Sequence, residues 1–220
     1  MKKIVAINAG PRKGWNTDQM VRAAANGAAQ AGAEITYIDL YKLPRFTGCI
    51  SCFGCKTEQS FGKCACRDGL SDVLEAIRNA DGLIVGSPNY LSNMTAGFRA
   101  LFERLVFQSL TYNKEKPNCN THLIPVLMIT TSNCAEEMYE AIGYTQMLES
   151  YKQSLSSFVG PTEVLVCGDT LQVEDYGKYD WTMFDPKAKK EHHDATFRSY
   201  LDKAYAQGKA LTERNDPAQG

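Results

Sequence analysis

The sequence predicts an α/β fold in which helices cover both faces of a doubly wound, five-stranded parallel sheet. Five short apolar runs rich in β-branched residues have the length of strands. Stretches with helical spacing of apolar residues separate these runs, an alternation typical of parallel sheets. Five strands are too few for the larger dinucleotide-binding fold built of two halves, so we expect the strand order 2-1-3-4-5.

The first half of the chain supplies three of these strands. "KIVAIN" at 3–8 is a β-branched apolar run and forms the first strand. Asn16 or Thr17 can cap the helix that follows, and Gly32 stops that helix. The other strands of this half are expected at 33–40 and 81–88, and its other helices at 70–79 and 95–110.

The second half supplies two strands, which are "THLIPVLMITT" at 121–131 and "TEVLVCGDTL" at 162–171. Helices are expected at 135–158 and at 194–212. His192 and His193 fall in the charged stretch before that last helix, and with His122 they form no convincing metal or catalytic set.

Length and charge limit the classes of protein that fit. The 220 residues suit one domain with a full core, predicted over 1–214, with a cysteine-rich loop at 41–68 and a frayed tail at 215–220. The formal net charge of -1 gives no basic field for nucleic acid. No apolar run approaches the length of a membrane span, and the N-terminus resembles a strand rather than a signal peptide. We therefore expect a cytoplasmic protein that binds neither nucleic acid nor membrane.

Function is expected in four loops that follow the strands, because ligands of such sheets bind beyond the carboxyl ends of the strands. These loops are 9–17, 41–68, 87–95 and 131–136. The second is far longer than an ordinary connection, which suggests a functional insertion.

The loop at 9–17 opens a helix directly after the first strand, an arrangement that favours binding of a phosphate. Arg12 and Lys13 add positive charge there, and Asn16 and Thr17 add side-chain donors. The simpler alternative is a capped helix with two solvated basic residues. The loop lacks both G-x-G-x-x-G and G-x-x-x-x-G-K-[ST], which argues against a resident nicotinamide dinucleotide and against a P-loop hydrolase.

The next two loops offer surroundings for a planar ligand. Tyr90 can place an aromatic face against such a ligand, and the small polar residues of 131–136 can border it. The alternatives are that Tyr90 and Met94 pack under the following helix and that Ser132 or Asn133 is an ordinary helix cap.

Five of the eight cysteines lie in one stretch of the second loop: Cys49, Cys52, Cys55, Cys64 and Cys66. The first three have the C-x2-C-x2-C spacing of bacterial ferredoxins, which favours an iron–sulfur cluster. Redox-active thiols and another metal remain alternatives. A disulfide framework is disfavoured in a reducing compartment, and structural zinc usually needs two C-x2-C pairs.

Three segments together carry a family resemblance. "AGPRKGWNT" resembles the G-S-P-R-K-x-G-N-T phosphate loop of flavodoxin-like NAD(P)H-dependent FMN reductases. "DGLIVGSPNYLSNMTAGFRALFERL" resembles a segment of the same family, and the cysteine stretch is similar to the motif of its iron–sulfur flavoprotein branch. The resemblance covers about the first 110 residues. Ala9-Gly10 replaces the family's Gly-Ser, and Trp15 replaces its second glycine.

The resemblance implies that the protein binds FMN, with the phosphate in the first loop and the ring between the other two. The cofactor-binding residues it implies are Gly10, Arg12, Lys13, Asn16, Thr17, Pro88, Asn89, Tyr90, Ser92, Asn93, Met94, Thr131, Ser132 and Asn133. Chemistry on the flavin requires no catalytic side chain. Cys134 is expected close to the flavin.

The iron–sulfur branch further implies a [4Fe-4S] cluster held by Cys49, Cys52, Cys55 and Cys64, with Cys64 chosen because "FGKC" matches the family's G-x-C. This loop begins at the end of the second strand, beside the proposed flavin loops, which suits electron transfer. The implied function is an FMN-dependent oxidoreductase that passes electrons between cluster and flavin. The alternatives are a cluster-free NAD(P)H-dependent reductase of quinones, free flavin or nitroaromatics, and a non-catalytic binding module.

The resemblance also implies partners. The electron donor is NAD(P)H or a ferredoxin-type protein, and the acceptor is a small molecule or a protein. Relatives commonly form dimers or tetramers in which a neighbour covers the flavin, so we expect a homodimer or homotetramer.

Overall fold

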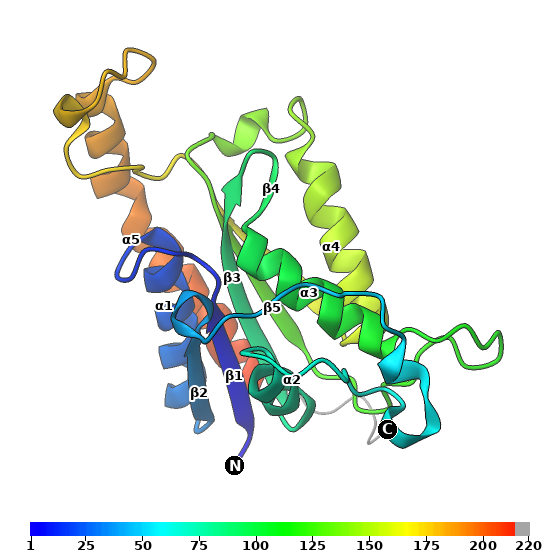
Figure 1. The fold of residues 1–220 in the computed structure, drawn as a ribbon. Helices are drawn as coiled ribbons and strands as arrows, with labels where there is room; N and C mark the ends of the chain where they lie inside the picture. The colour runs from blue at the N-terminus through cyan, green and yellow to red at the C-terminus, as the bar shows by residue number, and fades with distance from the viewer. Residues whose placement is uncertain (214–220) are drawn as a thin grey trace.

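The computed structural model of this protein describes residues 1–213, so the predicted tail at 215–220 and residue 214 lie outside the described residues. Five parallel strands form a sheet in the order β2-β1-β3-β5-β6 (Figure 1), which confirms the predicted fold class and strand order. The strands are β1 (Lys3–Asn8), β2 (Glu34–Asp39), β3 (Gly82–Tyr90), β5 (Val126–Thr131) and β6 (Thr162–Cys167).

Helices cover both faces of this sheet (Figure 1). One face carries α2 (Ser71–Arg78), α3 (Ala96–Ser109) and α4 (Tyr144–Phe158), and the other carries α1 (Asn16–Gln30) and α5 (Pro186–Glu213). Successive strand residues point to opposite faces. Val5 and Ile7 of β1 therefore pack in the core between the sheet and helices α2, α3 and α4. Ile4 and Ala6 pack in the core between the sheet and helices α1 and α5.

Two glycines allow α1 and α5 to pack at close range. A Cβ atom on Gly27 would lie 1.9 Å from the carbonyl oxygen of Tyr205, and one on Gly208 would lie 1.9 Å from that of Ala24. No side chain fits at such a distance, so glycine is required at both positions. This crossing fixes the long helix α5 against the helix that begins at the first loop.

The 87–95 segment departs from the predicted loop. The end of β3 instead turns back through Leu91 and Ser92, with φ of 52° and 62°, into the short antiparallel strand β4 (Asn93–Met94). Left-handed backbone at two residues that are not glycine is costly and persists only where the surroundings impose it.

Four further element boundaries differ from the prediction. The strand predicted at 162–171 ends at Cys167, and residues 168–171 form a loop. β5 starts only at Val126, after Pro125, which has no N–H for the sheet ladder. The helix predicted at 135–158 begins only at Tyr144, after Gly143, whose φ is 81°. Helix α5 begins eight residues earlier than predicted, because Asp185 accepts hydrogen bonds from the N–H groups of Lys187 and Ala188 at 2.9 and 3.2 Å and Pro186 suits a first helical position.

None of the helices within residues 1–213 combines the length and the apolar character that crossing a bilayer requires.

Candidate functional site

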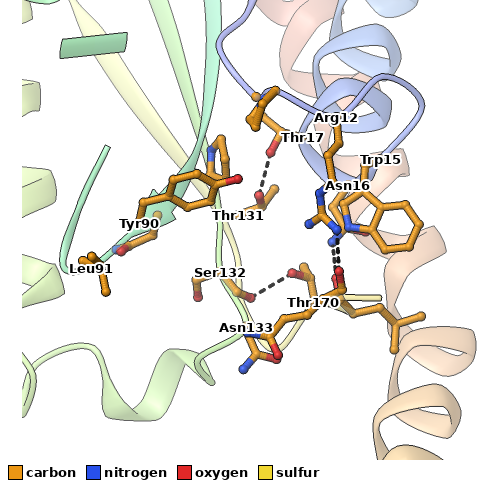
Figure 2. A pocket seen from close by; sticks show the side chains of 16 residues that line it. Arg12, Trp15, Asn16, Thr17, Tyr90, Leu91, Thr131, Ser132, Asn133 and Thr170 are labelled. Atoms are coloured by element: carbon orange, nitrogen blue, oxygen red, sulfur yellow. Dashed lines mark hydrogen bonds between the residues drawn. The ribbon is translucent and has the colours of Figure 1, made fainter. Parts of the chain in front are cut away.

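Loops at the carboxyl ends of β1, β3, β5 and β6 enclose a cavity of about 400 Å³ (Figure 2). This is the edge at which ligands of such sheets bind. Sixteen residues line the cavity: Gly10, Pro11, Arg12, Trp15, Asn16, Thr17, Pro88, Asn89, Tyr90, Leu91, Thr131, Ser132, Asn133, Thr170, Leu171 and Gln172. Ten of them belong to the set expected to bind FMN. The other four of that set, Lys13, Ser92, Asn93 and Met94, do not line it.

The start of α1 forms one wall of the cavity. The expectation that Asn16 or Thr17 caps this helix is wrong, because both lie inside its first turn. Their side chains instead tie the loops together: Asn16 Nδ2 donates to the carbonyl oxygen of Leu171 at 2.7 Å, and the hydroxyls of Thr17 and Thr131 lie 2.7 Å apart (Figure 2). The first N–H groups of a helix lack intrahelical partners, so this wall suits an anion.

Asp18, which was not predicted from the sequence, fixes the position of the loop at 9–17. Its carboxylate accepts hydrogen bonds from the N–H of Gly14 at 2.6 Å and from Tyr37, and it pairs with Arg22 at 3.0 Å. Burial favours the protonated form of Asp18, but these bonds outweigh it and lower the pKa of Asp18 below its ordinary value. An acidic residue in the first turn of a helix was the available signal.

Arg12 and Lys13 have different surroundings although they are adjacent. Arg12 lines the cavity, donates to the carbonyl oxygen of Gln172, and lies 4.6 Å over the ring of Trp15. Trp15, which replaces the family's glycine, thus packs against Arg12 in a cation–π contact. Lys13 is exposed outside the cavity.

The β3–β4 hairpin supplies the opposite wall. Tyr90 lines the cavity and is 45% exposed, so the alternative that it packs under the next helix does not apply. That alternative holds for Met94, which is buried in the core. Leu91 is fully exposed at the rim, and Asn93 faces α4, where it accepts a hydrogen bond from Tyr151 at 2.5 Å.

The loop after β6 completes the cavity and was not anticipated. Thr170 donates to the carbonyl oxygen of Ser132 through its N–H at 2.9 Å and through its hydroxyl at 3.0 Å (Figure 2). Asp169, at φ 48°, forms an ion pair with the buried Lys189 of α5. The position of this loop at the carboxyl edge of the sheet was the signal that could have revealed it.

Four residues that line this cavity each carry a buried polar atom with no hydrogen-bond partner within the described residues: Trp15 Nε1, Asn89 Oδ1, Asn133 Oδ1 and Gln172 Oε1. Buried polar groups normally have partners, so these residues leave unused hydrogen-bonding capacity in the cavity wall. The polar edge of a flavin ring offers both donors and acceptors, and the start of α1 suits a phosphate. The residues present therefore fit FMN.

The cysteine loop at 41–68 forms a second site, away from the cavity. It runs along α3 to the far end of that helix (Figure 1), where all five cysteines line a hollow together with Arg104, Phe107 and Gln108. The cysteines therefore lie against the second half of α3, away from the start of that helix. Thr95 caps the start of α3 next to the loops that enclose the cavity, and the helical rise places Gln108 about 20 Å from it.

The five thiols differ in their surroundings. Cys49 and Cys52 are exposed, Cys55 is buried, and Cys64 and Cys66 are half-buried. Burial raises the pKa of the Cys55 thiol. Within residues 1–213, no three His, Cys, Asp or Glu side chains are grouped closely enough to hold a metal ion. Five thiols around one hollow are nevertheless the donor type of an iron–sulfur cluster, so the residues fit one in ligand chemistry and would have to draw closer together to bind it.

The remaining cysteines and histidines lie elsewhere. Cys134, expected near the flavin, does not line the cavity, and burial raises the pKa of its thiol. His192 lies 3.5 Å from Asp169, and His193 stacks on Phe197. His122 contacts the carbonyl oxygen of Ala80 at 2.9 Å.

The parallel sheet with its cavity beyond the carboxyl ends of the strands defines a flavodoxin-like protein. Residues 2–143 match the family model of the NADPH-dependent FMN reductases, and the chain belongs to this family of FMN-dependent oxidoreductases.

Curated relatives of the chain include iron-sulfur flavoproteins. The chain is 36% identical over 102 residues to an iron-sulfur flavoprotein of Methanocaldococcus jannaschii, which covers 46% of this chain and 51% of the relative. It is 35% identical over 104 residues to an iron-sulfur flavoprotein of Methanosarcina thermophila, covering 47% and 52%. The chain thus spans about half the length of the curated relatives it matches.

Solved structures share the fold at low sequence identity. An NAD(P)H:quinone oxidoreductase from Methanothermobacter marburgensis has a TM-score of 0.72 and 18% identity, with 96% of this chain and 98% of that chain covered. An azoreductase from Bacillus anthracis has a TM-score of 0.68 and 15% identity, with 96% and 100% covered.

Proposed function

We propose that this protein binds FMN in the cavity and a [4Fe-4S] cluster at the cysteine hollow, and that it passes electrons between them. The observation that carries the proposal is the pairing of two sites on one helix: a cavity with unpartnered polar atoms at the start of α3 and five thiols around one hollow at its end. The iron-sulfur flavoproteins among the relatives support the same reading.

The chain's own residues bind and orient the flavin. Arg12 and the start of α1 hold the phosphate, while Tyr90 and the segment 131–133 border the ring. When bound, FMN supplies the redox chemistry by accepting a hydride or two electrons and releasing them singly or in pairs. No side-chain acid, base or nucleophile is required. Asn93 and Met94 act from outside the cavity by shaping the β3–β4 hairpin.

Cys64 is the fourth ligand in this proposal, after Cys49, Cys52 and Cys55. Its sulfur accepts a hydrogen bond from Arg104 Nε at 3.3 Å, whereas the sulfur of Cys66 lies 3.8 Å from a carboxylate oxygen of Asp68. A cationic donor stabilises a thiolate, and a neighbouring carboxylate opposes one.

A second candidate is a cluster-free reductase of quinones, free flavin or nitroaromatics that takes electrons from NAD(P)H. It is favoured by the match of residues 2–143 to a family described as NADPH-dependent. In this reading the five thiols serve as redox-active or structural groups.

The proposal also includes the redox partners, the oligomeric state and the cellular location. The donor is NAD(P)H or a ferredoxin-type protein, and the acceptor is a small molecule or a protein. A homodimer or homotetramer is supported by the exposure of Leu91 and Tyr90 at the rim of the cavity, where a second copy would cover apolar surface. A cytoplasmic location suits thiols that must stay reduced to bind iron.

An anaerobic preparation of the full chain tests the proposal by assays of flavin, iron and sulfide and by its visible spectrum. We expect flavin together with iron and sulfide. Flavin without iron or sulfide would leave the second candidate standing, and a preparation that neither contains nor takes up flavin would contradict both.

A further inference from the structure

Arg104 carries a charge but is almost fully buried, at 1% exposure, although it lies on α3 next to a loop. Within residues 1–213 its guanidinium bonds that loop alone, the cysteine loop at 41–68. Nη1 pairs with Asp68 at 2.5 Å and donates to the carbonyl oxygen of Thr47 at 3.4 Å. Nη2 donates to the carbonyl oxygen of Cys66 at 2.8 Å, and Nε donates to the sulfur of Cys64 at 3.3 Å.

A buried arginine is often energetically less favourable in a protein core than an apolar side chain of similar volume. Removing a guanidinium from water is costly, and an apolar residue of similar volume often stabilises a protein as well or better than a buried ion pair. What an arginine offers instead is a planar set of donors in fixed directions. Here these donors meet four residues of the cysteine loop. The role of Arg104 is therefore to set the position of that loop.

Gln108 acts on the same cysteine from one helical turn further along α3. Its side-chain oxygen accepts a hydrogen bond from the N–H of Cys64 at 3.1 Å, and the residue is buried. Positions four apart lie on one face of a helix. Cys64 is thus fixed by α3 at two points, its main-chain nitrogen and its sulfur.

The contacts distinguish Cys64 from Cys66. Arg104 bonds the main-chain carbonyl of Cys66, not its sulfur, and the Cys66 sulfur lies beside Asp68. Arg104 therefore donates a hydrogen bond to the sulfur of Cys64, whereas it bonds Cys66 through the main-chain carbonyl.

We infer that Arg104 is a positioning residue of the cysteine site, whose Nε–H group bonds the Cys64 sulfur when it ligates the cluster and raises the reduction potential of that cluster. The inference rests on the proposed function. Reduction by one electron, drawn from the donor, adds negative charge to the cluster and its sulfurs. A hydrogen bond to a ligand sulfur stabilises that charge, and bonds of this kind are among the factors that set cluster potentials.

The test compares two arginine-to-lysine substitutions in the full chain. Arg104→Lys keeps a positive charge near Asp68 but loses the planar fork, so one ammonium group cannot serve both Asp68 and the Cys64 sulfur. Arg67→Lys is the matched control, since Arg67 is an exposed residue of the same loop. The double variant Arg104→Gln, Asp68→Asn removes both charges together, which avoids an unpaired buried carboxylate.

Each protein is prepared anaerobically, assayed for iron, sulfide and flavin, checked by circular dichroism, and titrated with dithionite while the cluster is followed by electron paramagnetic resonance. We expect a lower midpoint potential, or loss of iron with fold and flavin retained, in both Arg104 variants. Arg67→Lys should match the wild type.

Three results would overturn the inference. The first is a cluster-loaded Arg104→Lys protein with the wild-type midpoint potential. The second is global unfolding of both Arg104 variants, which would give Arg104 a role in the whole fold. The third is a wild-type protein with flavin but no iron. That last result also removes the cluster from the proposed function, and it is distinguishable because it is seen before any variant is made.

Discussion

The hydroxyl of Tyr151 on α4 donates a 2.5 Å hydrogen bond to Oδ1 of Asn93, the first residue of β4. Tyr151 is buried, and burial raises the pKa of its phenol, so the donor stays protonated. Through this bond the helical layer holds the β3–β4 hairpin that forms one wall of the cavity.

The same hydroxyl belongs to a longer polar chain. Arg99 on α3 donates to Tyr151 at 3.0 Å and pairs with Glu103 at 3.5 Å. Glu103 in turn accepts a hydrogen bond from the N–H of Cys49 at 3.2 Å. A series of polar contacts along α3 therefore links Cys49 to the β3–β4 hairpin.

Tyr151→Phe should weaken binding of FMN by about 1 kcal/mol, because the hairpin loses one buried hydrogen bond. Titration of the apoprotein with FMN, followed by flavin fluorescence, measures the change. Tyr112→Phe alters an exposed tyrosine and serves as the control. Equal affinities in the two variants would show that Asn93 does not hold the hairpin.

Arg12→Ala should weaken binding of FMN by about 1–3 kcal/mol, because a charge-assisted hydrogen bond to phosphate is lost. Lys13→Ala removes the same charge one residue away but outside the cavity, and it should cost much less. Calorimetric titration with FMN distinguishes them. If Lys13→Ala has the larger effect, the phosphate lies outside the cavity wall formed by Arg12.

Tyr90→Ala should change the absorption and fluorescence of bound flavin, since this ring borders the cavity. Tyr112→Ala, well beyond α3, should leave both spectra alone. Visible absorption and fluorescence of the two loaded variants provide the comparison. Indistinguishable flavin spectra in the two variants would remove Tyr90 from the ring site.

Replacing single cysteines by serine should distinguish the cluster ligands from the cysteine that does not bind the cluster. We expect loss of iron and sulfide in Cys49→Ser, Cys52→Ser, Cys55→Ser and Cys64→Ser, and retention in Cys66→Ser. The proteins are prepared anaerobically and assayed for iron, sulfide and flavin. Retention in Cys64→Ser with loss in Cys66→Ser would reverse the choice of the fourth ligand.

Asp18→Asn should lower the free energy of unfolding by about 1–3 kcal/mol at neutral pH, since Asp18 accepts hydrogen bonds within α1 and its loop. Because the folded-state pKa of Asp18 lies below its unfolded value, its contribution is fully present above the unfolded pKa of about 3.9 and is lost as the pH falls through the folded pKa.

Urea unfolding as a function of pH therefore provides the measurement. The wild type should lose its advantage over Asp18→Asn as the pH drops below about 4. Asp72→Asn, at an exposed position in the first turn of α2, serves as the control. A difference between wild type and Asp18→Asn that does not change with pH would contradict the assignment.

Local pattern was enough to predict the sheet order and most of the cavity. The β-branched runs became β1 and β3, and the positions after them lie at the carboxyl edge by topology alone, which brought Arg12, Asn16 and Tyr90 to one cavity. The spacing of Cys49, Cys52 and Cys55 predicts a shared site, and the three cysteines border one hollow. These features depend on periodicity and chain order, which a sequence records directly.

Features that depend on contacts between distant segments could be seen only in the tertiary structure. The role of Asp18, the arrival of Thr170 at the cavity and the burial of Arg104 against the cysteine loop each join residues far apart in the chain. The path of the 41–68 loop to the far end of α3 was likewise beyond the sequence. A long irregular segment has no periodicity, so its course is set by the side chains of the helix that it packs against, here Arg104 and Gln108.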